Sequence, residues 1–227
     1  MSRVIFDIET VGVDLESLEL STQEYLLKGA ETEEERVKVR ESLSFYPLTG
    51  QVITIGMLNP DTGRGAVYFQ TNGEMLPPFE EDGIKYECGT EKEILEKFWS
   101  AVKTYRSFVT FNGRVFDCPF LLVRSAVHQV RPTRDLMPNR YNGAHIDLLD
   151  QLTFYGAAKR RFSLDMWCKT FNIKSPKAGG ITGYEVKDHF NAGHHVDIAR
   201  YCAGDLQATR ELLFIWENYM RFSPEKG

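Results

Sequence analysis

The sequence has 227 residues, of which 42% are hydrophobic and 26% charged, proportions that are ordinary for a globular protein with a buried core. No apolar run is long enough to span a bilayer, and the four cysteines are too widely spaced to indicate a zinc site or a disulfide framework. No signal-peptide pattern precedes the first apolar run, so we expect a cytoplasmic protein with reduced cysteines. We expect the chain to form one α/β domain over residues 1–227.

The net charge of −5 is unevenly distributed along the chain. Residues 14–45 hold nine acidic and four basic side chains, whereas residues 103–177 hold thirteen Lys and Arg against five Asp. A basic half suits a polyanion-binding face, although a solvated Arg-rich surface explains the same numbers. The short run Lys159–Arg161 has the same two interpretations, a solvated loop or a phosphate contact.

The first half of the chain predicts three strands, an acidic insertion and a helix. Arg3–Ile8 is a short run of β-branched and aromatic residues, typical of a buried strand, and residues 14–45 form a helical, amphipathic insertion after it. Two further strands are expected at Gln51–Leu58 and Gly65–Gln70, followed by an irregular loop over residues 71–89. Thr90 and Glu93 form a capping box at the start of a helix.

The second half alternates strands and helices. Ser107–Phe111 predicts a fourth strand, a helix begins near Asp117 with Pro119 in its first turn, and Ala144–Asp147 predicts a short fifth strand. The remaining helices are expected at residues 148–155, 163–171, 183–191 and 195–221. This order predicts a mixed five-stranded sheet flanked by helices.

Asp7 and Glu9 form the first candidate site. Side chains alternate along a strand, so both carboxylates emerge on one face, about 7 Å apart. Such a pair at the end of an apolar strand is poorly solvated unless a cation lies between the two groups, and Mg²⁺ or Mn²⁺ prefers oxygen ligands. On its own this pair is a weak signal, because an exposed rim of the sheet also explains it.

Asp117 is the second candidate, in the sequence Asn112-Gly-Arg-Val-Phe-Asp117 that follows the fourth strand. An acid in this position is usually a helix N-cap. We expect the fourth strand to lie beside the first, which would bring Asp117 towards Asp7 and Glu9.

Tyr201 and Asp205 are the third candidate, four residues apart and therefore on one face of the last helix. Asp205 could complete a metal site, and a phenol beside it could orient or accept a proton from water. An amphipathic helix with a half-buried tyrosine explains the same spacing.

Together, FDIET, NGRVFD and YCAGD resemble the three exonuclease motifs of the tyrosine branch of the DEDD superfamily, and most closely the proofreading exonuclease domain of family B DNA polymerases and its stand-alone relatives. The motifs occur in the right order over nearly the whole chain. The resemblance implies a ribonuclease H-like fold and metal-dependent 3′→5′ exonuclease activity.

The resemblance also implies a role for each motif residue. Asp7 would bind both of two divalent cations, Glu9 and Asp205 the one that activates water, and Asp117 the other. Tyr201 would orient the attacking water. The remaining implied residues contact nucleic acid: Thr10, Asn112 and Phe116 at the terminal nucleotides, and either Lys177 or Lys174 at the scissile phosphate.

We therefore expect an exonuclease that uses two Mg²⁺ or Mn²⁺ ions on single-stranded DNA. RNA is the first alternative substrate, because nothing in the sequence recognises or excludes a 2′-hydroxyl. A non-catalytic nucleic-acid-binding module is the second alternative, although the presence of all four acids and the tyrosine counts against it. The acidic insertion at 14–45 is expected to cover one side of the cleft or to bind a protein partner.

Overall fold

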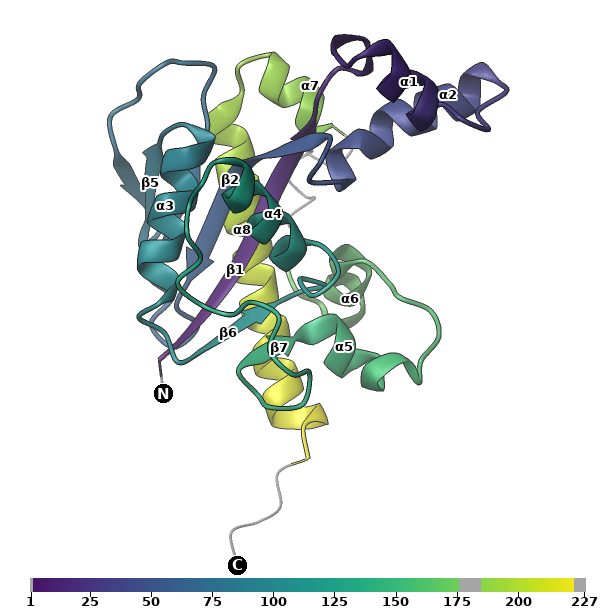
Figure 1. Ribbon diagram of the computed structural model, residues 1–227. Coiled ribbons are helices and arrows are strands. Elements are labelled where there is room, and N and C mark those ends of the chain that lie inside the picture. The colour runs from purple at the N-terminus through teal and green to yellow at the C-terminus, as the bar shows by residue number, and fades with distance from the viewer. Residues whose placement is uncertain (1, 176–184, 223–227) are drawn as a thin grey trace, which may run out of the picture.

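A computed structural model describes residues 2–175 and 185–222 and places a mixed seven-stranded sheet at its centre (Figure 1). The strands lie in the order β4-β5-β3-β2-β1-β6-β7. β1 pairs antiparallel with β2 and parallel with β6, and the fold thus confirms that the first and fourth predicted strands are neighbours. The strand bounds are β1 (Arg3–Gly12), β2 (Gly50–Leu58), β3 (Gly65–Phe69), β4 (Phe79–Glu81), β5 (Ile84–Cys88), β6 (Ser107–Thr110) and β7 (His145–Asp147).

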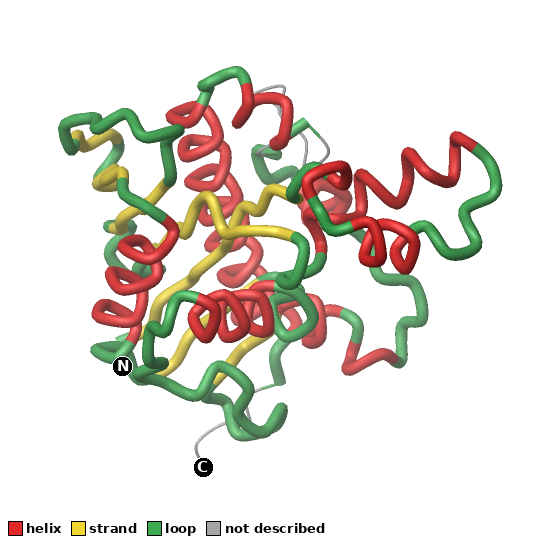
Figure 2. Tube along the Cα trace, turned by 45° about the horizontal axis from the view of Figure 1, so that its top comes forward, coloured by secondary structure: helices red, strands yellow, loops and turns green. Residues whose placement is uncertain are grey.

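Helices cover both faces of this sheet (Figure 2). α8 crosses β1, β2 and β3 on one face, whereas α3 and α4 lie on the other. The helix bounds are α1 (Leu20–Leu26), α2 (Glu33–Ser42), α3 (Glu91–Val102), α4 (Asp117–Val127), α5 (Leu148–Leu152), α6 (Leu164–Phe171), α7 (Val186–Asn191) and α8 (His195–Ile215). Four shorter helical turns are η1 (Leu15–Ser17), η2 (Leu43–Phe45), η3 (Phe154–Gly156) and the π-helical η5 (Trp216–Met220).

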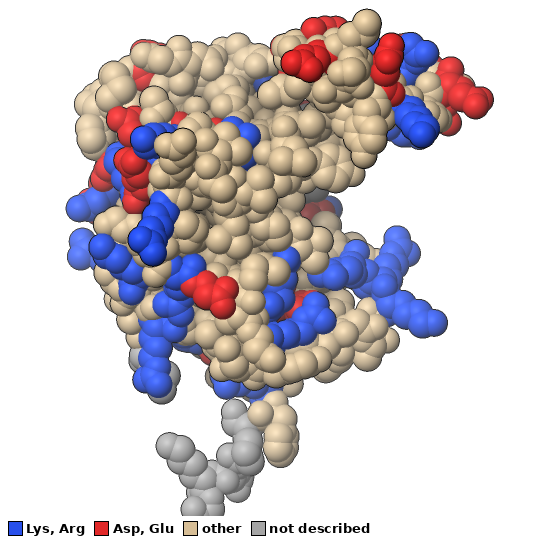
Figure 3. Space-filling view, in the orientation of Figure 1, with Lys and Arg blue, Asp and Glu red and all other residues tan. Residues whose placement is uncertain are grey.

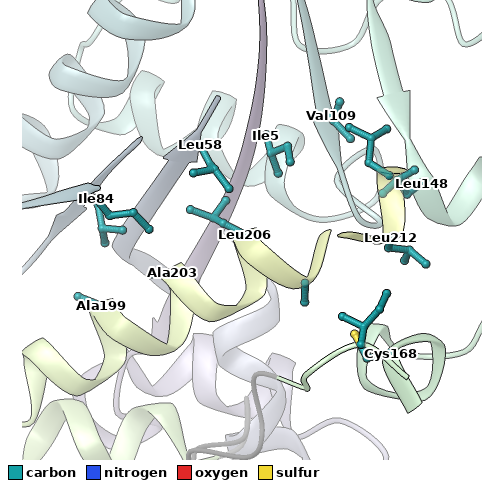
Figure 4. Packing of buried hydrophobic residues seen from close by; sticks show 14 of the residues in the cluster. Ile5, Leu58, Ile84, Val109, Leu148, Cys168, Ala199, Ala203, Leu206 and Leu212 are labelled. Carbon is teal, nitrogen blue, oxygen red and sulfur yellow. The ribbon is translucent and has the colours of Figure 1, made fainter. Parts of the chain in front are cut away.

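Two large apolar layers pack against the faces of the sheet, and a smaller cluster joins α7 to β1, β2 and α8. The layer under α8 joins Ile5 and Leu58 of the sheet to Leu206 and Leu212 of the helix (Figure 4). The layer on the opposite face joins Val4, Phe6 and Ile8 of β1 to the buried side of α3, including Phe98. Because β1 supplies both layers, its side chains must alternate between the two faces, and this alternation sets where Asp7 and Glu9 point.

The prediction of a strand at Arg3–Ile8 was too short. β1 runs on to Gly12 and pairs with β2 as far as Gly50, with a register shift between Glu9 and Thr10. The carboxylates of Asp7 and Glu9 therefore lie within a strand rather than at its end.

The predicted irregular loop over residues 71–89 was wrong in its second half, and the sheet has seven strands instead of five. β4 and β5 form a hairpin around Asp82-Gly83, which both have positive φ, at 50° and 79°. An Asp-Gly pair with that backbone is the preferred two-residue hairpin turn.

The insertion at 14–45 is helical, as predicted, but it is not amphipathic along its length. α1 and α2 have no buried residue and project from the body as an arm (Figures 1 and 2). Only the ends of the insertion are anchored, by Leu15 and Leu43, which are buried. Within residues 2–175 and 185–222, no helix combines the length and the apolar composition of a membrane span.

Candidate active site

Asp7 and Glu9 point from β1 towards α8. Their odd-numbered neighbour Ile5 packs in the layer under α8, whereas Phe6 and Ile8 pack in the opposite layer. On the neighbouring strand β2, Gly56 lies opposite Asp7 and Thr54 opposite Glu9. The alternation of a strand thus delivers both carboxylates to the same helix-covered face.

Gly56 lets α8 approach the sheet beside Asp7. A Cβ at this position would meet Cys202 Sγ and Leu206 Cδ1 at 2.7 Å, closer than side chains can pack. The Cys202 thiol accordingly lies 3.9 Å from the Asp7 carboxylate. Close packing at a glycine of β2 therefore places the 201–205 turn of α8 against β1.

The structure brings the carboxylates of Asp7, Glu9 and Asp205 together. One oxygen from each of the three lies within 4.8 Å of the other two. The two elements involved are nearly two hundred residues apart in sequence, so the group is created by the fold.

Asp117 joins this group from the first turn of α4. Its Oδ1 accepts a hydrogen bond from the backbone N–H of Ile8 at 3.1 Å. This amide is available because β6 is short and pairs with β1 only from Arg3 to Ile5. Asp117 therefore replaces the missing strand partner of β1, one residue from both Asp7 and Glu9.

The loop between β6 and α4 is fixed by Asp147, a residue to which the sequence analysis gave no role. Its two carboxylate oxygens accept hydrogen bonds of 2.9 Å from the backbone N–H groups of Asn112 and Arg114. Asn112 has a left-handed backbone, with φ of 66°, and a Cβ on Gly113 would lie 2.4 Å from the Thr110 hydroxyl. Asn and Gly are the residue types that tolerate these conditions, which explains the Asn-Gly pair locally.

The carboxylates share a strongly anionic environment. Burial first, and then the charges of Asp117, Asp205 and Glu9, hold the pKa of Asp7 well above its usual range. Burial, followed by the charges of Asp205 and Asp117, does the same for the pKa of Glu9. The pKa of Asp117 rises to about 7, mainly through burial.

Tyr201 lies beside these acids on α8. Burial and the charges of Asp205, Glu9 and Asp7 raise the pKa of its phenol, and a hydrogen bond to Asp205 acts in the same direction. Tyr201 therefore stays neutral, and its O–H group donates a hydrogen bond to Asp205.

The acids open into a cleft of about 700 Å³. Its apolar wall includes Phe116, Val115 and Phe45, and Phe45 reaches the cleft from the end of the acidic insertion. Among the described residues that line the cleft, Arg161 is the only Lys or Arg, and it donates a 2.8 Å hydrogen bond to Asn112 Oδ1. No local sequence pattern indicates that Phe45 belongs to the cleft, and Arg161 stands out only as part of a short basic run.

This donor set suits a divalent cation. Several buried carboxylates with raised pKa values repel one another, and the cleft's single arginine is engaged by Asn112. Carboxylate oxygens are the preferred ligands of Mg²⁺ and Mn²⁺. Asp7, Glu9 and Asp205 could hold one such ion, and Asp117 is placed to contribute to a second.

The predicted nucleic-acid contacts are placed unequally. Asn112 and Phe116 line the cleft. Thr10 is buried and donates its hydroxyl to Ser44 O at 2.7 Å, which anchors the insertion to β1. Lys177 lies outside the described residues, and Lys174 lines a different cavity, together with Arg200.

Comparisons with known proteins identify a family and a similar fold. The model of a family described as "predicted 3′-5′ exonuclease related to the exonuclease domain of PolB" matches residues 78–224, a range that includes Asp117, Tyr201 and Asp205. No curated protein matches the chain. The structure of the family B DNA polymerase from the hyperthermophilic archaeon Pyrobaculum calidifontis is similar over 95% of this chain and 24% of the polymerase, with a TM-score of 0.58 and 18% sequence identity. This similarity confirms the expected ribonuclease H-like α/β fold.

Proposed function

The chain belongs to the family of predicted 3′-5′ exonucleases related to the exonuclease domain of PolB, and from this we propose that it removes nucleotides from the 3′ end of single-stranded DNA with two divalent cations. The observation that carries the proposal is the convergence of Asp7, Glu9 and Asp205, whose oxygens lie within 4.8 Å of one another. The family match begins after β1, so the assignment of Asp7 and Glu9 rests on this geometry.

The acids would hold the ions. Asp7 would contribute to both ions, Glu9 and Asp205 to one of them, and Asp117 to the other. When bound, such ions neutralise the phosphodiester, make water a better nucleophile and stabilise the departing 3′-oxygen. Asp117 would be presented to its ion with one oxygen already fixed by the Ile8 amide.

Tyr201 would orient the attacking water. The neutral phenol donates its one O–H hydrogen bond to Asp205, so its oxygen would accept a hydrogen bond from the attacking water. The hydrogen bond to Asp205 fixes that hydroxyl beside a proposed ion ligand.

The apolar wall of the cleft would hold the end of the strand. Phe116 packs against Phe45 in an edge-on contact, with ring centroids 6.4 Å apart, and both line the cleft. An unpaired base can stack on such rings, whereas a base within a duplex is already stacked and paired. Asn112 offers a polar group next to this apolar wall. Arg161 holds its side chain, and Asp147 accepts a hydrogen bond from its backbone N–H.

The proposal is tested with 5′-end-labelled single-stranded DNA and RNA of the same sequence, with Mg²⁺, with Mn²⁺ and with EDTA. We expect a ladder that shortens stepwise from the 3′ end of DNA and is abolished by EDTA. A faster ladder on RNA would replace the substrate class, internal cuts would indicate an endonuclease, and binding without hydrolysis would overturn the proposal.

Two variants connect the ladder to the carboxylate group. Asp7→Asn should lower the rate roughly 100-fold or more, because it removes a charge that stabilises the transition state through the ions. Asp188→Asn is the matched control, an exposed acid on α7 outside the cleft, and should leave the rate unchanged. Equal rates for the two variants would contradict the assignment of the site.

A further inference from the structure

The segment after α5, together with Tyr141, carries aromatic and basic side chains, most of which lie outside the cleft. We propose that this segment forms a second binding surface for unpaired nucleic acid, which guides the strand out of the cleft. The surface, here called the exit surface, consists of Tyr141, Phe154, Tyr155, Lys159, Arg160 and Phe162. The inference rests on the proposed function in one respect, that the ligand of the cleft is nucleic acid.

Three aromatic rings of the exit surface are unusually exposed. Tyr141 is 73% exposed, Phe154 60% and Tyr155 40%. Phe154 and Tyr155 both have left-handed backbones, with φ of 50° and 57°, which bulky residues rarely adopt. The chain thus presents two consecutive aromatic residues to solvent in a costly conformation.

The two tyrosine rings of this surface, Tyr141 and Tyr155, are held in place. Tyr155 packs on Tyr141 with ring centroids 5.0 Å apart, and its hydroxyl accepts a 2.8 Å hydrogen bond from Gln151 Nε2. A ring fixed in this way offers a face for stacking at little further cost in side-chain entropy.

The cations next to these rings are available for phosphate. Lys159 and Arg160 are exposed, and neither forms a salt bridge with any residue in the ranges 2–175 and 185–222. Arg160 instead lies over the ring of Phe162, 4.9 Å from its centroid. Aromatic faces alternating with unpaired cations are the usual composition of a surface that binds a single strand without regard to sequence.

The exit surface reaches the cleft along the chain. Arg161 and Phe162 line the cleft, and Phe154 and Tyr155, seven residues earlier in the same segment, line a second cavity of about 400 Å³ together with Tyr141. A strand whose end lies at Phe116 therefore meets Phe162 first and the tyrosine pair afterwards.

Charge favours this direction over the opposite side of the cleft. The arm of α1 and α2 belongs to the segment that carries nine acidic and four basic side chains. Figure 3 shows a hollow between the acidic arm and a part of the surface where Lys and Arg side chains gather. A polyanion that leaves the cleft is repelled by the arm and attracted by Lys159 and Arg160.

The test measures the affinity for oligothymidylates of increasing length, from a dinucleotide to about 16 nucleotides, with Ca²⁺ in place of Mg²⁺, so that the carboxylates are neutralised by an oxygen-binding cation while hydrolysis is suppressed. A dinucleotide occupies the cleft alone, whereas longer strands also reach the exit surface. We expect affinity to rise with length in the wild type. The double variant Lys159→Gln/Arg160→Gln should lose most of that rise and keep the dinucleotide affinity.

Two further readouts separate direct contact from a general effect of charge. For long strands, the slope of log affinity against log salt should fall by about 1.4 in the double variant, since each phosphate contact contributes about 0.7. Tyr155→Asn should lower the affinity for long strands roughly 5-fold or more and leave the affinity for the dinucleotide unchanged. Asn is chosen because it tolerates the left-handed backbone at this position.

Matched controls come from the arm. Arg36→Gln/Lys38→Gln removes the same charge from two exposed positions of α2, and Tyr25→Asn removes a ring that is 76% exposed on α1. Both controls should bind all lengths as the wild type does. Equal losses in control and test variants, or losses that are the same for the dinucleotide and the long strands, would overturn the inference.

Failure of this inference can be told apart from failure of the proposed function. A wild type that degrades DNA from the 3′ end, with no length-dependent loss in the variants, would refute the exit surface alone. A wild type that never degrades DNA, but binds with the expected length dependence, would refute the nuclease proposal and leave the exit surface standing.

Discussion

Replacing Gly56 with alanine should damage the active site more than it damages the fold. The new Cβ would meet Cys202 Sγ and Leu206 Cδ1 at 2.7 Å, whereas ordinary contacts between such atoms are about 3.5–4.0 Å. Restoring that distance requires a displacement of about 1 Å between β2 and α8. Because α8 carries Tyr201 and Asp205, this displacement moves both away from Asp7.

The two consequences differ in size. Overpacking a core position costs about 1–3 kcal/mol of unfolding free energy, and the lower chain entropy of alanine offsets about 0.4–1 kcal/mol of it. A misplacement of about 1 Å in a catalytic group costs roughly 100-fold in rate. The expected variant is therefore folded and only mildly destabilised, but nearly inactive.

The assay compares urea unfolding with the rate of 3′-end degradation. Ile94→Val, a buried substitution on the opposite face of the sheet, should lose about 0.5–1.5 kcal/mol and keep its activity. Adding Cys202→Ala to the Gly56 variant removes one of the two close contacts and should recover part of the rate. A Gly56→Ala protein with full activity would refute the reasoning that this glycine sets the position of α8.

Three further predictions concern metal, pH and a buried ion pair. Mg²⁺ at about 100 times its dissociation constant should stabilise the protein by about 2.7 kcal/mol, and Asp205→Asn should lose most of that gain; an equal thermal shift in both proteins would argue against Asp205 as a ligand. Burial, and then the charge of Arg114, lower the pKa of His145 to about 3, below its value in the unfolded chain. As pH falls below about 6.5, the unfolded chain gains a proton on His145 while the folded protein does not. The stability that this group contributes is therefore lost at about 1.4 kcal/mol per pH unit down to about pH 3. In urea titrations, the unfolding free energy of His145→Gln should depend correspondingly less on pH. Glu91→Ala should cost about 3–5 kcal/mol in urea unfolding, because the buried Glu91 carboxylate binds the half-buried guanidinium of Arg124 at 2.7 and 2.8 Å and its loss leaves that cation without its anion; a loss below about 1 kcal/mol would show that the ion pair contributes little to stability.

Local sequence patterns predicted the elements whose cause is itself local. The capping box of Thr90 and Glu93 starts α3 as expected, because both of its hydrogen bonds form within four residues. The strand at Ser107 and the helix at Asp117 were likewise confirmed within one residue. Here the apolar pattern and the turn residues indicate the same structure.

The β4–β5 hairpin was missed although its signals are present in the sequence. Ile84, Tyr86 and Cys88 alternate with polar residues, and their burial alternates with them. The preceding residues 71–78 form neither helix nor strand, so the expected loop is present in the first half of this segment only. The Asp82-Gly83 pair was the indication of a hairpin.

The arm shows the opposite error, an apolar pattern without burial. The amphipathic interpretation would bury the apolar residues of the insertion, yet Tyr25 of α1 and Val37 of α2 are 76% and 42% exposed. The spacing of residues in a helix states which side chains share a face, and only the tertiary fold decides whether another element covers it. The proposal that the insertion binds a protein partner therefore stays a prediction.

The candidate site could likewise be predicted only in part from the sequence. The motif order predicted which acids converge, and the structure places Asp7, Glu9 and Asp205 together. The roles of Gly56, Asp147 and Arg161 could not be predicted, because each acts on a residue far away in sequence. A close approach between a strand and a helix leaves no local pattern.

The most direct test of the central claim is an anomalous-scattering experiment on crystals grown with Mn²⁺. We predict a manganese peak at about 2 Å from carboxylate oxygens of Asp7, Glu9 and Asp205, and its disappearance in crystals of Asp205→Asn. The absence of a peak at these three residues at saturating Mn²⁺ would contradict the account.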